Sequence, residues 1–202
     1  MNCKPMTSGH LSTAVTAALG VALLAAAPRA NAQACAVEAE DFYGLSGEQI
    51  VSLYACMEAE MAAAYAQSDN EVAKSYREWT VAGVRPGPDP SHGDRLLLTF
   101  ANELAADAYL QFGSEGVEMP VGAVLAKESI GLGNGTAQVG PLFIMEKVGA
   151  EAAPDTGGWR YSGVQPNGAM LGAPESFCHD CHSQFEGQDA LAYPAEELRV
   201  SD

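Results

Sequence analysis

The chain has 202 residues, 48% of them hydrophobic, and its 26 acidic side chains outnumber the 10 lysines and arginines to give a net charge of −16. This acidity argues against nucleic acid and anionic lipid as partners, because both are negatively charged and would repel it. It is compatible with a basic redox partner protein.

The first 34 residues have the pattern of a secretory signal peptide. Lys4 lies in a short polar start, an apolar run covers residues 14–27, and Ala30-Asn31-Ala32 supplies an A-x-A cleavage site. We expect cleavage near residues 32–34 and export to the periplasm. The apolar run is too short to span a bilayer and no later run is longer, so we expect no membrane span.

The mature chain, residues 35–202, is expected to form a single domain. Its net charge is −18, because the signal peptide removes Lys4 and Arg29 and leaves 26 acidic against 8 basic side chains. Cys35 and Cys56 are expected to pair in a disulfide, since an oxidising compartment favours the bond over two free thiols. Such a bond contributes about 2–4 kcal/mol. A lipid anchor on Cys35 is the weaker alternative, because the residues before it lack the usual bulky apolar side chain.

Residues 35–75 are predicted to be a helical extension. Ser46-Gly47-Glu48-Gln49 matches a capping box, which is typical of a helix start. Apolar side chains then recur at helical spacing, at Ile50, Leu53, Tyr54, Met57 and Met61. A second, short helix is predicted from about residue 70 to residue 78.

From residue 79 the pattern changes to strands. The loop at residues 85–90, Arg-Pro-Gly-Pro-Asp-Pro, is expected to interrupt both helix and sheet. Asn134-Gly135 favours a tight hairpin turn. The predicted strands are residues 79–84, 95–100, 122–130, 136–148 and 159–164, with a helix over residues 102–112. We therefore predict an α+β fold, an antiparallel sheet of about five strands with flanking helices.

Cys178-His179-Asp180-Cys181-His182 reads C-x-x-C-H, the pattern of a covalent c-type haem attachment segment. Two cysteines at this spacing can each add a thiolate across one haem vinyl group, and His182 then lies under the iron as an axial ligand. Half a zinc site or a redox C-x-x-C pair is less favoured. No second Cys/His pair completes a zinc tetrahedron, and no thioredoxin-like βαβ pattern surrounds the motif.

Five short motifs, taken in order, resemble the cytochrome P460 family. The similarity covers roughly residues 74–194 and leaves the N-terminal helix outside. The motifs are Tyr76-Arg77-Glu78-Trp79, His92-Gly93 followed by Arg95, Pro-Val-Gly-Ala-Val-Leu-Ala-Lys-Glu at residues 120–128, Gly158-Trp159-Arg160-Tyr161, and the C-x-x-C-H segment. The resemblance implies one haem c domain at residues 35–202, and it suggests a homodimer.

Characterised enzymes of that family oxidise hydroxylamine at a haem whose porphyrin is covalently bonded to a lysine. Lys127 matches the position of that lysine, so the resemblance implies an additional Lys–porphyrin cross-link here. The alternative is a solvated lysine on a sheet. Because successive side chains of a strand point to opposite faces, Leu125 shares the face of Lys127 and Glu128 does not.

Three further positions are candidates for the haem site. Glu151 lies in a Val-Gly-Ala-Glu stretch that is similar to the segment carrying the family's distal carboxylate. Glu146 is the other candidate for a catalytic base. A solvated loop carboxylate is the alternative for Glu151. Arg95 matches a basic residue of the family and can pair with a haem propionate or a bound oxyanion. The alternative is that it only balances the acidic surface. His92 is a conceivable sixth ligand, but a hydrogen bond within its loop is favoured. Met145 and Met170 are the remaining conceivable axial ligands, and core packing is favoured for each.

The leading interpretation is a periplasmic haem c oxidoreductase that oxidises hydroxylamine or a related small nitrogen compound and passes electrons to a redox partner protein. Its catalytic residues would be Lys127, Glu151 and Arg95. The first alternative is a protein that binds nitric oxide, similar to β-type cytochromes c′. The second is an electron-transfer cytochrome, which usually has a stable second axial ligand.

Overall fold

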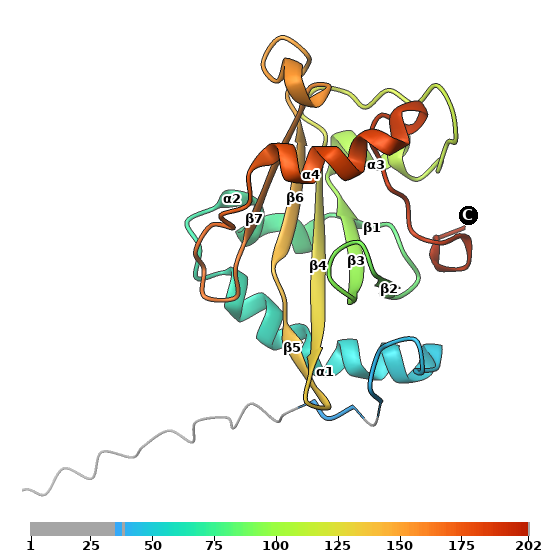
Figure 1. The fold of residues 1–202 in the computed structure, drawn as a ribbon, viewed down its shortest axis with the longest axis vertical. Helices are drawn as coiled ribbons and strands as arrows, with labels where there is room; N and C mark the ends of the chain where they lie inside the picture. Colours follow the sequence, from blue (N-terminus) through green and yellow to red (C-terminus); the bar gives the residue numbers. More distant parts are fainter. Residues whose placement is uncertain (1–34, 38, 202) are drawn as a thin grey trace, which may run out of the picture. The chain divides into compact units, whose positions relative to one another are not determined.

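An antiparallel sheet of seven strands runs through the part of the chain described here, residues 35–37 and 39–201 of a computed structural model. The strand order is β1-β3-β4-β6-β7, with β2 paired to β3 and β5 paired to β4 (Figure 1). The strands are β1 (Thr80–Val81), β2 (Gly87–Asp89), β3 (Arg95–Ala101), β4 (Val124–Gly133), β5 (Thr136–Val139), β6 (Leu142–Lys147) and β7 (Trp159–Val164). The predicted α+β class is confirmed. The signal peptide predicted for residues 1–34 lies outside the described residues.

The long helix α1 (Gly47–Tyr65) begins at the predicted capping box. The Ser46 hydroxyl accepts a hydrogen bond from the Gln49 backbone N–H at 3.3 Å, and the Gln49 side chain accepts one from the Ser46 N–H at 2.8 Å. The other helices are α2 (Glu71–Ser75), α3 (Glu103–Tyr109), α4 (Glu175–His182) and the short 3-10 turns η1 (Tyr76–Glu78), η2 (Pro154–Thr156), η3 (Ser183–Gln188) and η4 (Glu196–Leu198).

Two strand predictions were wrong in detail. The loop at residues 85–90 carries the short strand β2, because Pro88 lies on an edge strand where its missing N–H breaks no interior ladder. The single strand predicted for residues 136–148 is two strands, divided at Gly140-Pro141, where proline cannot donate a ladder hydrogen bond. The hairpin between β4 and β5 forms as predicted, with Asn134 at φ 52° and Gly135 at φ 70°.

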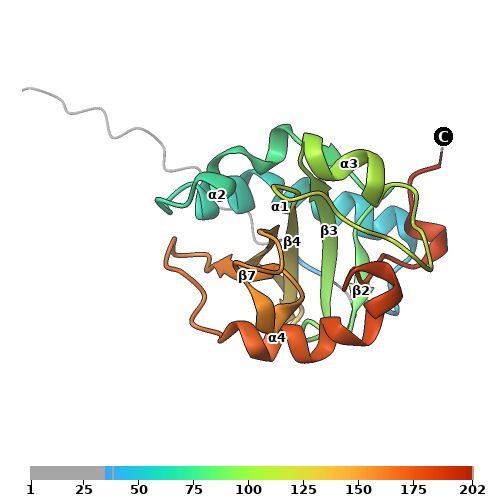
Figure 2. The same cartoon turned by 90° about the horizontal axis from the view of Figure 1, so that it is seen from above.

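The two faces of the sheet are covered by different helices, α1 on one side and α4 on the other (Figure 2). Against α1 the sheet presents Leu96, Phe100, Ala126 and Ile144, which pack with Met57 and Met61. The other face presents Leu125, Met145, Trp159 and Tyr161. The alternation of side chains along each strand therefore decides which residues can reach the C-x-x-C-H segment on α4.

A disulfide joins Cys35 to Cys56, as the sequence predicted, with the two Cα atoms 6.1 Å apart. It ties the segment before α1 to the middle of that helix. The same segment is attached to the β4–β5 hairpin, where the Val37 N–H donates to the Gly135 carbonyl at 2.9 Å. Within the described residues, no helix has the length and apolar character needed to cross a membrane.

Candidate functional site

A cavity of about 310 Å³ lies between α4 and the sheet. Its sheet side is formed by side chains of β4, β6 and β7, including Leu125, Lys127, Phe143, Met145 and Tyr161. Its other side is formed by Cys178, Cys181 and His182 of α4. The strand register places these residues side by side. Lys127 of β4 is paired with Thr99 of β3 and with Phe143 of β6.

Cys178 lies three residues before Cys181 and four residues before His182, which is about one turn of the helix. All three side chains therefore reach the cavity. Cys178 and Cys181 are free thiols, the first half-buried and the second exposed. Burial raises the pKa of the Cys178 thiol, with a further contribution from Cys181 and Glu175. His182 ends the helix and is only 7% exposed.

The ring of His182 is held in one orientation. Its Nδ1 lies 2.8 Å from the carbonyl oxygen of Ala190, and because a carbonyl can only accept, Nδ1 carries the proton and Nε2 keeps its lone pair. Burial and then the charge of Lys127 lower the pKa of His182 to about 4, so the ring is neutral at pH 7. A neutral imidazole with its second nitrogen fixed by a carbonyl is the form that binds metal.

Asp189 organises the turn that carries the Ala190 carbonyl. Asp189 and Ala190 both have positive φ, 52° and 63°, an uncommon conformation for residues other than glycine. The Asp189 carboxylate accepts from Lys147 Nζ at 2.6 Å and from the Met119 N–H at 2.8 Å. The Trp159 indole N–H donates to the Asp189 carbonyl at 2.9 Å. The Ala190 carbonyl, which accepts the hydrogen bond from His182, is therefore held in place against the sheet.

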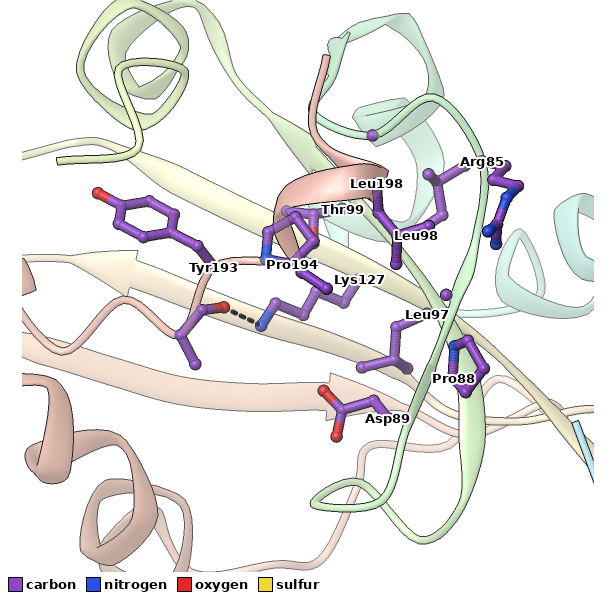
Figure 3. A pocket seen from close by; sticks show the side chains of 14 residues that line it. Arg85, Pro88, Asp89, Leu97, Leu98, Thr99, Lys127, Tyr193, Pro194 and Leu198 are labelled. Carbon is purple, nitrogen blue, oxygen red and sulfur yellow. Dashed lines mark hydrogen bonds between the residues drawn. The ribbon is translucent and has the colours of Figure 1, made fainter. Parts of the chain in front are cut away.

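Lys127 lies between the large cavity and a second one of about 90 Å³, whose lining includes Thr99 and Tyr193 (Figure 3). The lysine is 7% exposed, and its Nζ donates to the Ala192 carbonyl at 3.4 Å. Burial lowers the pKa of Lys127, although the carboxylate of Asp89 opposes this. The structure thus excludes a solvated lysine on the sheet surface and places a buried amine at the cavity wall.

Glu128 faces away from the cavity, as strand alternation predicts, and lies in the core beneath α1. Its carboxylate accepts from the Tyr54 hydroxyl at 2.6 Å and from the Tyr76 hydroxyl, and it pairs with Arg77. Burial raises the pKa of Glu128. This network was missed from the sequence, because Tyr54 is 74 residues away and no local pattern joins the two.

His92 lies in the loop between β2 and β3 and lines the large cavity. Its Nδ1 is 3.3 Å from Oδ1 of Asp89, and its ring packs against Phe143 with the ring centres 4.9 Å apart. Burial would raise the pKa of Asp89, but its contacts with His92 and the charge of Lys127 outweigh this and lower it to about 2. His92, which the sequence placed in a loop without regular structure, therefore lines the cavity.

The other sequence candidates do not reach the cavity. Glu151 is exposed in the turn after β6, and Glu146 is exposed because it alternates with the inward-facing Met145. Arg95 packs its guanidinium over Gly131 and Gly140 at the far end of the sheet. The expectation that Glu151 and Arg95 join Lys127 at one site is not met by this arrangement, since the fold holds both outside the cavity lining.

The residues around the cavity fit a haem. Over the described parts of the chain, no group of three His, Cys, Asp or Glu side chains could hold a bare metal ion. A porphyrin brings four nitrogen ligands of its own, so His182 alone would suffice to hold its iron from the protein side. Two thiols at the rim and an apolar wall of Leu125, Phe143 and Met145 complete what such a group requires.

A protein-family model described as Cytochrome P460 matches residues 73–192, from within α2 to beyond α4. This chain belongs to the cytochrome P460 family. The protein is accordingly a mono-haem cytochrome, and the predicted family is confirmed over nearly the same range. A search of curated proteins found no match to the chain. The P460 match includes the sheet, Lys127 and the C-x-x-C-H segment, and it leaves α1 outside.

Proposed function

We propose that this protein is an exported haem c oxidoreductase of the cytochrome P460 type that oxidises hydroxylamine or a related small nitrogen compound. Cys178 and Cys181 hold the haem through thioethers, and His182 binds its iron. The observation that carries the proposal is the burial of Lys127 at the wall of the cavity that the C-x-x-C-H segment closes. A buried amine in this wall supports the proposal that Lys127 bonds covalently to the porphyrin.

The rest of the cavity wall is mainly apolar, which suits a small, weakly polar substrate. When bound, the haem supplies an iron that accepts electrons from the substrate. Leu125, Phe143 and Met145 exclude water from the space in front of it, which strengthens electrostatic interactions inside. The Ala190 carbonyl keeps His182 in the tautomer whose Nε2 lone pair is available to the iron.

Export is supported by two independent features. The first is the signal-peptide pattern of residues 1–34, and the second is the Cys35–Cys56 disulfide, since such bonds persist in oxidising compartments. The mature net charge of −18 suits a basic electron-accepting protein as partner.

The test is carried out on the full chain, exported and matured with haem. Intact mass, proteolytic mapping of the haem peptide and a ferrous absorption spectrum are recorded, followed by hydroxylamine oxidation with an artificial electron acceptor. We expect a haem peptide that carries a second peptide containing Lys127, together with turnover. An ordinary haem c spectrum, an unlinked haem peptide and no turnover would contradict the enzyme.

Nitric oxide binding, as in β-type cytochromes c′, is the second candidate. The observation that favours it is the exposed position of Glu151, because the cavity then has no acidic side chain among its lining residues in the described structure. Adding nitric oxide to the ferrous protein in the same experiment separates the two candidates. A gas binder would take up nitric oxide in the ferrous state without oxidising hydroxylamine.

A further inference from the structure

We propose that His92 binds the haem iron opposite His182 in the resting protein, so that a small ligand must displace it to reach the iron. The inference rests on the haem attachment proposed above. It goes beyond that proposal because it assigns the second axial position and makes access to the iron a competition.

The separation of the two histidines carries the argument. Imidazole nitrogens bind metal ions at about 2.0–2.1 Å, and the ring centre lies about 1.1 Å behind the nitrogen, so two imidazoles on opposite sides of one ion have centres about 6.2–6.4 Å apart. The ring centres of His92 and His182 are 6.2 Å apart, and both rings line the same cavity. This separation equals the one that two imidazoles on opposite sides of one metal ion have, and the ring planes are inclined at 72°.

His92 has a carboxylate beside its Nδ1, although this buried nitrogen makes no hydrogen bond in the structure. A metal-binding histidine almost always uses its second ring nitrogen to contact a carboxylate, a backbone carbonyl or water. His92 places Nδ1 3.3 Å from the Asp89 carboxylate, and His182 places Nδ1 2.8 Å from the Ala190 carbonyl. In both residues Nε2 is the nitrogen that remains for a metal.

The loop that carries His92 is held in place. Oδ1 of Asp89 accepts from the backbone N–H groups of Ser91, at 2.8 Å, and of His92, at 3.2 Å. Asp89 itself belongs to β2 and pairs with Arg95 of β3. The His92 side chain is only 17% exposed and packs on Phe143. The ring is thus fixed before any haem binds.

Three other groups on the sheet side of the cavity could bind iron. Met145 is packed in the buried cluster with Leu125 and Tyr161. Lys127 Nζ donates to the Ala192 carbonyl, and the Tyr161 hydroxyl lies 3.2 Å from Nδ1 of His179. Neither contact leaves the group oriented as a ligand opposite His182. His92 is the better candidate on geometry.

The first experiment uses the ferric, haem-loaded full chain. We expect the wild type to give a low-spin electron paramagnetic resonance spectrum and His92→Gly to give a high-spin one. Adding imidazole to His92→Gly should give the same low-spin spectrum as the wild type. The low-spin state of the wild type without added imidazole is the result that a merely structural role would not produce. His179→Ala is the matched control, since His179 lies on α4 but does not line the cavity, and it should stay low-spin.

The second experiment measures cyanide binding to the same ferric proteins. If His92 occupies the iron in nine molecules out of ten or more, removing it should increase the apparent affinity for cyanide at least about 10-fold. Asp89→Asn keeps an acceptor for the Ser91 and His92 N–H groups but removes the negative charge beside Nδ1. It should increase the affinity by a smaller factor.

A high-spin wild type whose spectrum and cyanide affinity are unchanged in His92→Gly would overturn the assignment. Haem staining of the same samples on a denaturing gel separates the causes of failure. Stained but high-spin protein would reject His92 as a ligand and leave the attachment at Cys178 and Cys181 standing. Unstained protein would reject both.

Discussion

Lys127 and Glu128 are neighbours on β4, yet their side chains belong to opposite sides of the molecule. Lys127 lines the cavity beneath α4, whereas Glu128 is hydrogen-bonded to Tyr54 at 2.6 Å in the core beneath α1. Both are almost fully buried, with exposed fractions of 7% and 1%. A substitution at one position should therefore affect haem chemistry, and a substitution at the other should affect folding.

For Lys127→Leu we expect the haem to be retained, because the thioethers do not involve this residue. The ferrous spectrum should shift toward that of an ordinary haem c, and most hydroxylamine oxidation should be lost while nitric oxide is still bound. Absorption spectroscopy and turnover measurements check this. If wild type and variant have identical ferrous spectra and haem-peptide masses, Lys127 is not cross-linked.

For Glu128→Gln we expect a loss of about 1–3 kcal/mol in the free energy of unfolding, because the hydrogen bonds from Tyr54 and Tyr76 to a charged carboxylate are weakened, while Arg77 keeps its pair with Glu58. Urea unfolding measures the change. The haem spectrum of the protein that remains folded should equal that of the wild type, since the residue lies on the other face of the sheet. A variant of normal stability would show that the network is not needed for folding.

The amount of haem that stays attached after denaturation should fall in Cys178→Ala and in Cys181→Ala. It should fall to zero in the double variant. The chain offers no other free thiol among its described residues. Haem staining on a denaturing gel is the measurement, with Cys56→Ala as a control for loss of a cysteine elsewhere. Haem that survives denaturation in the double variant would falsify the attachment.

Asp189→Ala should loosen the ring of His182, because it disturbs the turn that carries the Ala190 carbonyl. It leaves the charge of Lys147 unpaired in a partly buried site, which costs about 3–5 kcal/mol of unfolding free energy. Loss of the Ala190 carbonyl position should also shift the reduction potential, measured by redox titration. Lys74→Met, which removes an exposed ion pair with Glu71, is the control and should change stability by less than about 1 kcal/mol.

Alkaline pH should destabilise the core around Glu128. Burial, followed by the charge of Glu128, raises the pKa values of Tyr54 and Tyr76 above the ordinary value of 10.0. The unfolded chain then releases these protons first, so their contribution to stability is complete below pH 10 and is lost as the pH rises further. Urea unfolding between pH 8 and 11 should show this loss, and Tyr54→Phe should make the decline shallower. An equal decline in that variant would assign the effect to other groups.

Local patterns were sufficient for several parts of the protein. The capping box at Ser46, the Asn134-Gly135 turn and the alternation around Lys127 all depend on residues a few positions apart, and each formed as expected. The division of β5 from β6 at Gly140-Pro141 follows from the same kind of local chemistry, but the continuous apolar pattern concealed it.

The sequence by itself determined the C-x-x-C-H segment and the opposite directions of Lys127 and Glu128, because helix and strand periodicity are properties of neighbouring residues. The disulfide followed from two cysteines outside the motif in an exported chain. The face to which Lys127 points was decided by the packing of the sheet. Only the tertiary structure decided that Glu151 is exposed, that Glu128 meets Tyr54 and Tyr76, and that His92 lies 6.2 Å from His182. Those relationships join segments up to 90 residues apart, and they depend on how the sheet, α1 and α4 pack. No local preference encodes the distance between a loop and a helix that meet across a sheet.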